Sequence, residues 1–468
     1  MSGTIILNPS ASQTALADAI SQACTGDKSL QLAAGIHLTK PGYRNKIKVP
    51  AEGITIKGDG NKELVFIKRP DGAIGSVVEG RPDDNYGLFF IPADPTAGEL
   101  IIINNPANNR WKKYEGDCNQ IYWYATMLRG KIDISNVTLD CNMQQQGLAA
   151  IYSAGGNAEH SCMIGFSGTY YNIPPGIDGI EKRIYIGFEA VSITNIHSRN
   201  GGYADDIWCA RGYFYPNIST VSIDNIKAFN RVHPKRATIS FSGLAKDINI
   251  SNADIYRLEC EETSADVRQQ PAHESFAGSK WIINNVKTDY IDIAAKGHVL
   301  YIQGDQLETK KGFNLYQATG FIKRSIFRRE GQDPRLFRLN HFLFEKVKWI
   351  FTAVEEGPNK EMIMGIRPVT QYGEPFSATF LKNEFLVDGP FTGGQLISSE
   401  FTRLEPGNIL DVIFKNCKYD NRFGTGEFPI AIVREKGTCT FKKTDFGTRD
   451  RTVAVVAGDP EFVKLVWI

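Results

Sequence analysis

The chain has 468 residues, and its 42% hydrophobic content is enough to bury a substantial core, which excludes an intrinsically disordered protein. Its 53 basic and 52 acidic residues leave a formal net charge of +1, which argues against a dedicated nucleic-acid-binding protein. No apolar run reaches the length needed to span a bilayer. The 44 glycines and 27 phenylalanines favour strands and turns over a helical bundle.

The amino-terminal residues 1–10 lack the basic and then apolar order of a secretory signal. This favours a cytoplasmic or phage-associated protein over one secreted by the Sec pathway, although the location itself does not follow. The eight cysteines lie far apart and form no CxxC pair, so we expect buried thiols rather than a zinc or redox centre.

The first predicted element is a short helix. Four apolar residues between Leu16 and Ala23 recur with the spacing of one helix face, which predicts a helix that begins near Ser12 or Thr14. We expect residues 1–29 to form a cap, because the first coil of a repeat structure otherwise exposes unpaired strand edges and an apolar cross-section.

From about residue 30, one short pattern recurs: alternating apolar residues, then a polar residue that is usually Asn, then often another apolar one. Examples are IDISNV at 132–137 and VSITNI at 191–196. The spacing is about 30 residues, and two gaps are close to double that length. The equivalent polar residues, which we call corner residues, are Asn136, Asn195, Asn225, Asn252, Asn285, Lys346, Asn383, Asn416 and Lys443.

This period, with strand-like alternation and no helical segment in between, predicts an all-β fold: a parallel β-solenoid over residues 30–468. Asn suits a corner because it tolerates the left-handed backbone conformation, and its amide can bond to the next coil, about 4.8 Å away. A β-sandwich with Asn in its turns is the alternative. Three stretches break the rhythm and are predicted as loop insertions that border a binding groove, near 81–116, 155–179 and 304–334.

Two early segments carry a resemblance to a known family. LQLAAGIHL at 30–38 and ITIKGDG at 54–60 resemble the opening of the pectate-lyase-like β-helix proteins, in which a short helix leads into such strands. Together with the corner residues, the resemblance covers most of the chain. It implies a single-stranded right-handed parallel β-helix and an activity on carbohydrate.

Charged residues recur ten or eleven positions after four consecutive corner residues. If the coils are in register, these charges form a row with one residue per strand spacing. Adjacent strand residues face opposite ways, so only one of Asp205 and Asp206 can point outward. The candidate catalytic residues are Asp205, Asp206, Arg236, Glu262 and His233, and the candidate substrate-binding residues are Trp208, Arg211, Arg231, Lys235, Glu259, Arg268, Lys296 and His298.

The middle of this row carries a second resemblance. GGYADDIWCARG at 201–212 and FNRVHPKRATISFSG at 229–243 are similar to coils of polygalacturonase-like hydrolases and phage depolymerases. The resemblance assigns the family's acidic residue to Asp205 or Asp206 and its arginine to Arg236. The complete motif sets of polygalacturonases and pectate lyases are absent, so the resemblance does not identify the sugar.

Two mechanisms use these residues, and we favour the first. A glycoside hydrolase needs two carboxyl groups, and Asp206 and Glu262, on coils two apart, would lie about 9.6 Å from each other, which suits inversion. Lys235 and Arg236 between them would hold an acidic sugar. The alternative is a polysaccharide lyase.

In a lyase, Arg236, Lys235 or His233 would be the base, and Lys296 or Arg268 would neutralise a uronate. Calcium is then a possible cofactor, held by acidic residues, and we predict no other cofactor or metal site.

A third reading is a glycan-binding protein without turnover, similar to a phage tail spike. The expected partner in every case is a polysaccharide or oligosaccharide, with neither nucleic acid nor membrane, and the protein would be a monomer or a homotrimer. The basic stretch 321–350 would steer an acidic glycan or would simply be a solvated surface.

Overall fold

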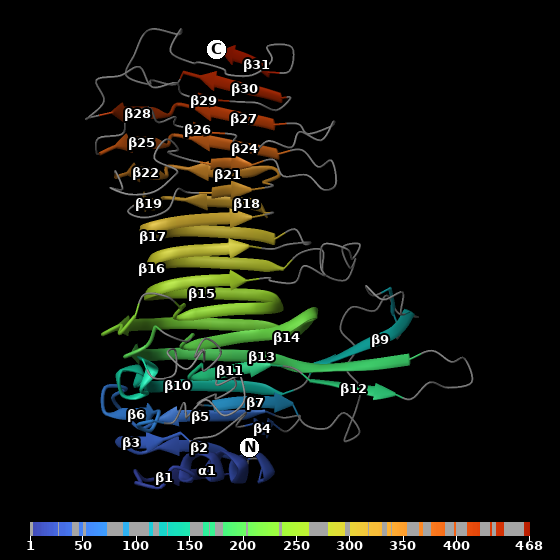
Figure 1. Ribbon diagram of the computed structural model, residues 1–468, viewed down its shortest axis with the longest axis vertical. Coiled ribbons are helices and arrows are strands. Elements are labelled where there is room, and N and C mark those ends of the chain that lie inside the picture. Colours follow the sequence, from blue (N-terminus) through green and yellow to red (C-terminus); the bar gives the residue numbers. More distant parts are fainter. Residues whose placement is uncertain are drawn as a thin grey trace. The chain divides into compact units, whose positions relative to one another are not determined.

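The computed structural model divides the chain into two compact units, Met1–Ser279 and Lys280–Ile468. Strands dominate both units, and most of them pair in parallel (Figure 1). The structure describes residues 3–26, 28–39, 46–49, 53–72, 88–92, 112–115, 121–128, 130–149, 162–167, 169–173, 181–202, 205–233, 236–261, 279–294, 300–316, 318–329, 335–337, 339–352, 365–367, 376–388, 397–398, 410–421, 431–432, 437–443 and 463–468.

The amino-terminal unit begins with the predicted helix. Helix α1 (Ala15–Thr25) follows Thr14 and buries the expected apolar face, including Leu16 and Ile20. In the part of the chain that the structure describes, no helix has the length and apolar character that crossing a bilayer demands. The strands before the long coils are β1 (Thr4–Leu7), β2 (Ser29–Leu32), β3 (Gly35–Leu38), β4 (Lys46–Val49), β5 (Ile54–Gly58), β6 (Val65–Lys68) and β7 (Leu88–Pro92).

The long coils of this unit stack in register. Val191 pairs with Val221, and Val221 pairs with Ile248, so side chains of one kind lie above one another in the buried interior. This parallel stacking is consistent with an all-β parallel solenoid. The strands are β8 (Lys112–Glu115), β9 (Ile121–Leu128), β10 (Lys131–Asp140), β11 (Ile164–Ser167), β12 (Thr169–Ile173), β13 (Glu181–Arg199), β14 (Ile207–Phe229) and β15 (Ile239–Glu261), and a short 3-10 helix, η2, spans Met143–Gln145.

The predicted corner geometry is present. Asn136, Asn195, Asn225 and Asn252 all have positive φ, between 52° and 57°. The amide of Asn195 donates to the Asn136 side chain, and Asn225 Nδ2 donates to Asn195 Oδ1 at 3.0 Å. Asn252 instead donates to Asp224 Oδ1 at 2.8 Å. Hydrogen bonds between Asn side chains, which we call the amide ladder, therefore link three coils, and at the fourth corner the Asn bonds to a carboxylate instead.

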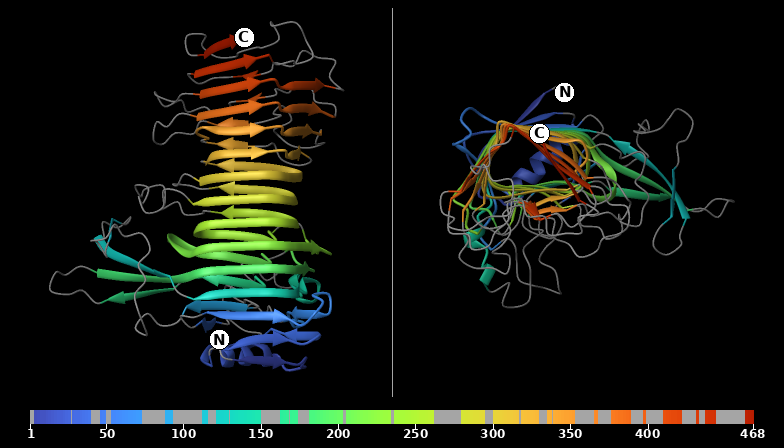
Figure 2. Two further views of the ribbon diagram at one scale, coloured as in Figure 1. Left: turned by 180° about the vertical axis from the view of Figure 1, so that it is seen from behind. Right: turned by 90° about the horizontal axis from the view of Figure 1, so that it is seen from above.

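The first doubled gap lies between Asn136 and Asn195, and part of this segment projects from the stack of coils. Strand β10 pairs directly with β13, although β11, which lies between them in sequence, stays in the parallel stack between β7 and β14. Strands β9, β12 and the start of β13 extend away from it, with β12 antiparallel to β13 (Figures 1 and 2). Within the first two predicted insertions, β7, β8, β11 and β12 are strands, and the rest lies largely outside the described residues.

From β18 onward, the strands of the carboxy-terminal unit are short. Its strands are β16 (Lys280–Ala294), β17 (Leu300–Tyr316), β18 (Ala318–Lys323), β19 (Ile326–Arg329), β20 (Arg335–Phe337), β21 (Phe342–Glu345), β22 (Lys348–Phe351), β23 (Gly365–Arg367), β24 (Phe376–Leu381), β25 (Glu384–Val387), β26 (Ile397–Ser398), β27 (Leu410–Lys415), β28 (Lys418–Asn421), β29 (Ala431–Ile432), β30 (Gly437–Lys442) and β31 (Val463–Trp467). Strands β18, β21, β24, β27 and β30 form one parallel stack, and β19, β22, β25 and β28 form another (Figure 1).

This unit corrects two expectations. Strands cover most of 304–334, where we predicted a loop, because the corners there are Gln306 and Arg324 rather than Asn. One corner also shifts by a residue: Lys382 has the positive φ of 55°, whereas Asn383 is fully buried. Asn383 Nδ2 donates to the Phe344 carbonyl at 2.7 Å, which accounts for a polar side chain in the core.

Candidate functional site

The predicted site lies on two neighbouring connections of the coil stack, the segment between β13 and β14 and the segment between β14 and β15. Backbone bonds hold the two crossings together: Val232 N–H donates to the Gly201 carbonyl and Arg236 N–H to the Gly202 carbonyl, both at 2.9 Å. The Asp205 carboxylate accepts the Ala237 N–H at 3.0 Å. Residues predicted from separate coils are therefore joined by direct contacts.

Two glycines make this close approach possible. Gly202 has a φ of +117°, and a Cβ there would lie 1.8 Å from the His233 carbonyl oxygen. A Cβ on Gly201 would lie 2.0 Å from Asp206 Oδ1. Both positions therefore require glycine for steric reasons, and Gly202 requires it for its backbone conformation as well.

Asp205 and Asp206 directly precede β14, and they differ in exposure as predicted. Asp205 is half-exposed, whereas Asp206 is only 4% exposed. Ser198 Oγ donates to Asp206 Oδ2 at 2.7 Å, and Cys141 Sγ donates to Oδ1 at 3.3 Å. Burial raises the pKa of Asp206, and the bond from Ser198 opposes the shift. The outward carboxylate is thus Asp205, and Asp206 cannot meet a polymer on the surface.

Three basic candidates stand near Asp205. Arg231, His233 and Arg236 are all half-exposed. Arg231 Nε donates to the His233 carbonyl at 2.6 Å, and its guanidinium lies 5.0 Å from the centre of the Tyr256 ring. These contacts fix the direction of Arg231 and tie it to the strand of the next coil.

Two further predicted residues are buried, and the rest lie outside the described residues or have side chains there. Trp208 is 4% exposed, and Glu259 is 2% exposed and paired with Arg257 Nη2 at 2.9 Å, so burial removes both from contact with a polymer. Arg211 lies in β14 and pairs with Ser167, and its side chain is outside the described residues. Also outside them are Lys235, Glu262, Arg268, Lys296 and His298.

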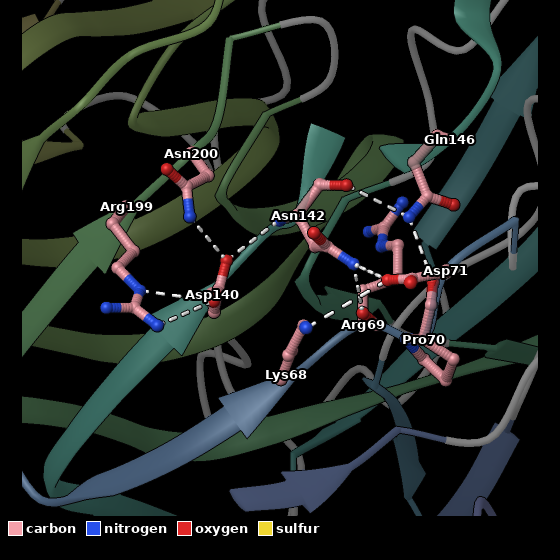
Figure 3. A network of polar contacts seen from close by, with 9 residues as sticks. All are labelled: Lys68, Arg69, Pro70, Asp71, Asp140, Asn142, Gln146, Arg199 and Asn200. Atoms are coloured by element: carbon pink, nitrogen blue, oxygen red, sulfur yellow. Dashed lines mark hydrogen bonds and ion pairs between the residues drawn. The ribbon is translucent and has the colours of Figure 1, made fainter. Parts of the chain in front are cut away.

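The sequence analysis missed a buried polar network beside the site (Figure 3). Asp140, at the end of β10, accepts Arg199 Nη2 at 2.8 Å and Nε at 3.1 Å on Oδ2. Its Oδ1 accepts Asn200 Nδ2 at 2.8 Å and the Asn142 N–H at 3.1 Å. Four donors thus surround a carboxylate that is 3% exposed, as burial of a charge demands.

A sequence signal for this network did exist. Asn142, Asn200 and Asn230 all have positive φ, between 50° and 59°, and follow the first corner residues by five or six positions. They mark a second corner of the same coils. The pattern used to predict the coils contains one Asn per coil and therefore does not include this second series.

The interior beside Asp206 also holds a cation. Arg69 is 2% exposed, and its Nη2 donates to the Cys162 carbonyl at 2.9 Å. Burial lowers the pKa of Arg69, and the charge of Asp206 counteracts that shift. The six cysteines with described side chains, Cys24, Cys141, Cys162, Cys209, Cys260 and Cys417, are buried free thiols, as predicted. Among the described residues, no three His, Cys, Asp or Glu side chains gather as metal ligands.

Neither a protein-family model nor a curated protein matches the chain. Among solved structures, it is similar to one titled "Crystal structure of Agl-KA catalytic domain", with 14% sequence identity and a TM-score of 0.36. The similarity covers 97% of this chain and 65% of that chain, so this chain spans just under two thirds of that length. Likeness at this level carries no argument about activity.

Proposed function

We propose that this protein cleaves the glycosidic bonds of an acidic polysaccharide, as a glycoside hydrolase of the right-handed parallel β-helix type. The observation that carries the proposal is the joining of Asp205, His233 and Arg236 across two coils by Gly202 and its neighbours. These side chains are half-exposed, whereas most strand side chains around them are buried. An extended polymer could lie across successive coils at this point.

In the hydrolase mechanism, Asp205 takes the part that we had given to Asp206. One carboxylic acid protonates the leaving oxygen, and a second carboxylate activates water or attacks the sugar, at a separation of about 5 to 9.5 Å. Glu262 remains the proposed second group. Arg236 would bind the acidic substituent of the sugar through charge-assisted hydrogen bonds.

A lyase is the second candidate, because the described surface holds more basic groups than carboxylates. Arg231, His233 and Arg236 stand beside the single half-exposed Asp205. In β-elimination, His233 would remove the proton next to a uronate carboxylate, and Arg236 would neutralise that carboxylate. Breaking the bond to the leaving oxygen then produces an unsaturated uronate.

The test is cleavage of a panel of uronate-containing and neutral polysaccharides, followed by reducing ends and by the ultraviolet absorbance of unsaturated uronates. A hydrolase releases reducing ends without that absorbance, and a lyase gives both. We expect Asp205→Asn to lower kcat by about 100-fold or more in the hydrolase case. Asp59→Asn, an exposed carboxylate in a turn elsewhere, is the matched control and should keep full activity.

Two results would contradict the proposal. The first is the absence of cleavage of every polysaccharide by the folded wild-type protein, which would leave glycan binding without turnover. The second is full activity in both Asp205→Asn and Arg236→Ala, which would move the chemistry away from this site.

A further inference from the structure

The corners of the carboxy-terminal unit carry cations. From β18 onward, the residues with positive φ at the first corner are Arg324, Lys346, Lys382, Asn416 and Lys443, with φ between 47° and 55°. Each stands directly after a strand of one stack, and for the first four a single residue separates the corner from the next strand of the other stack. Four of these five corners are therefore basic.

Backbone hydrogen bonds place these corners one above another. Lys346 N–H donates to the carbonyl of Leu381, the residue before the next corner, at 2.9 Å, and Lys382 N–H donates to Lys415 at 2.8 Å. Asn416 N–H donates to Lys442 at 3.0 Å in the same way. Successive corners are thus one strand spacing apart, about 4.8 Å.

Further lysines flank this column. Lys415 and Lys442 pair across β27 and β30 just before their corners, and Lys418 begins β28 just after one. We call the set the basic edge: Lys346, Lys382, Lys415, Lys418, Lys442 and Lys443. All are exposed except Lys442, which is half-exposed.

The start of the column is neutralised, whereas three of its later corner lysines have no described ion pair. Arg324 is paired with Asp305, and Lys323 Nζ lies 3.4 Å from Glu345 Oε2. Within the described ranges, Lys346, Lys382 and Lys443 form no ion pair. Like charges at successive corners repel one another, which lowers stability.

The backbone conformation adds to the cost. A residue with a Cβ is disfavoured in the left-handed region, and Asn is among the few side chains that adopt it readily. The amino-terminal unit uses Asn at the corresponding corners. Lys at three corners therefore gives up local stability, and the positive charge is the property gained.

We propose that the basic edge binds a linear anionic glycan, with a carboxylate or sulfate group of successive sugars set against successive coils. The inference goes beyond the proposed cleavage and does not require it. A single column of cations suits a chain with charges in single file. A nucleic acid fits less well, because the neighbouring aromatic side chains Trp349, Phe385 and Phe414 are buried and offer no stacking platform for bases.

The test is equilibrium titration of the full chain with four probes: a polygalacturonate fragment, a heparin fragment, dextran and a single-stranded oligodeoxynucleotide. The variant is Lys346→Asn/Lys382→Asn/Lys443→Asn, which copies the natural Asn416 corner and therefore preserves the fold. Its matched control removes three exposed lysines of the other unit, Lys57→Gln/Lys227→Gln/Lys246→Gln.

We expect the corner variant to weaken binding of at least one anionic glycan by about tenfold, since each exposed charge contact contributes modestly. The control should change binding by less than about twofold, and added salt should weaken wild-type binding. Polygalacturonate binding identifies carboxylate recognition, and heparin binding identifies sulfate recognition.

Three outcomes would overturn the inference: unchanged glycan binding in a folded corner variant, an equal loss in the control, or tighter binding of dextran or the oligonucleotide than of both anionic glycans. The test is separable from the proposed function. The corner variant changes no residue of the candidate site, so loss of binding in that variant reports on the basic edge, whereas full cleavage by Asp205→Asn would contradict only the catalytic proposal.

Discussion

The two units place different side chains at corners that have the same backbone conformation. In the amino-terminal unit, Asn136, Asn195 and Asn225 adopt positive φ and bond to one another through their amides. In the carboxy-terminal unit, Lys346 and Lys382 adopt the same backbone conformation without that ladder. The coil therefore dictates the backbone conformation at a corner, whereas side chains as different as Asn and Lys can occupy it.

The interiors differ as well. The amino-terminal stack is mainly aliphatic and includes a buried acid, Asp206. The carboxy-terminal stack is aromatic: the rings of Phe344 and Phe380 stack with centroids 5.1 Å apart, and those of Phe380 and Phe414 with centroids 5.0 Å apart. Among the described residues, every buried Asp, Glu, Arg or His side chain lies in the amino-terminal unit.

The largest effect is expected from breaking the aromatic stack. Trp349 is fully buried, contacts five aromatic rings, and donates from Nε1 to Asn383 Oδ1 at 3.1 Å. Trp349→Ala should lower the free energy of unfolding of the carboxy-terminal unit by about 3 to 5 kcal/mol, through the cavity and the broken bond. Chemical denaturation measures this loss. Trp349→Phe should lose clearly less, and an equal loss would show that ring packing is not the cause.

A smaller effect concerns the buried acid of the amino-terminal unit. The pKa of Asp206 in the folded state is raised above its unfolded value of 3.8 by burial. Its contribution to stability is therefore fully present below about pH 4 and is lost as the pH rises through the raised pKa. Asp206→Asn should remove this part of the pH dependence. Denaturation at a series of pH values would show a flatter profile, and a profile unchanged from wild type would contradict the assignment.

The smallest effect is a reciprocal exchange at the corners. Asn195→Lys should destabilise the protein by about 1 kcal/mol, because it removes the amide bonds and places a less suitable residue at positive φ. Lys346→Asn should be neutral or stabilising by about 0.5 kcal/mol. Thermal unfolding of the two variants measures the difference. Equal losses in both would show that the corners are not equivalent after all.

Much of the fold could be predicted because its signals are local. The helix that follows Thr14 and the positive-φ corners at Asn136 and Asn195 depend on side-chain spacing and on the backbone preference of Asn. The coils with Gln306 and Arg324 escaped detection, since their corners lack the Asn that marked the others. Asn383 was misplaced by one residue because a buried Asn with satisfied bonds reads in sequence like a corner Asn.

The candidate site was predicted only in part. Alternation required one of Asp205 and Asp206 to point inward, but it did not say which one. That choice depends on Ser198 and Cys141, which reach Asp206 from other parts of the coil stack. The Asp140 and Arg199 pair depends likewise on the register between β10 and β13.

The amino-acid sequence by itself determined the strand-rich coils, their corners and the helix, because alternation and left-handed preference act within a few residues of chain. Only the tertiary structure decided which carboxylate is exposed and which lysines share an edge. Those properties arise from contacts between coils, where residues about 30 apart in sequence lie one strand spacing apart in space. The near-neutral net charge of the chain therefore conceals both a buried acid and a basic edge.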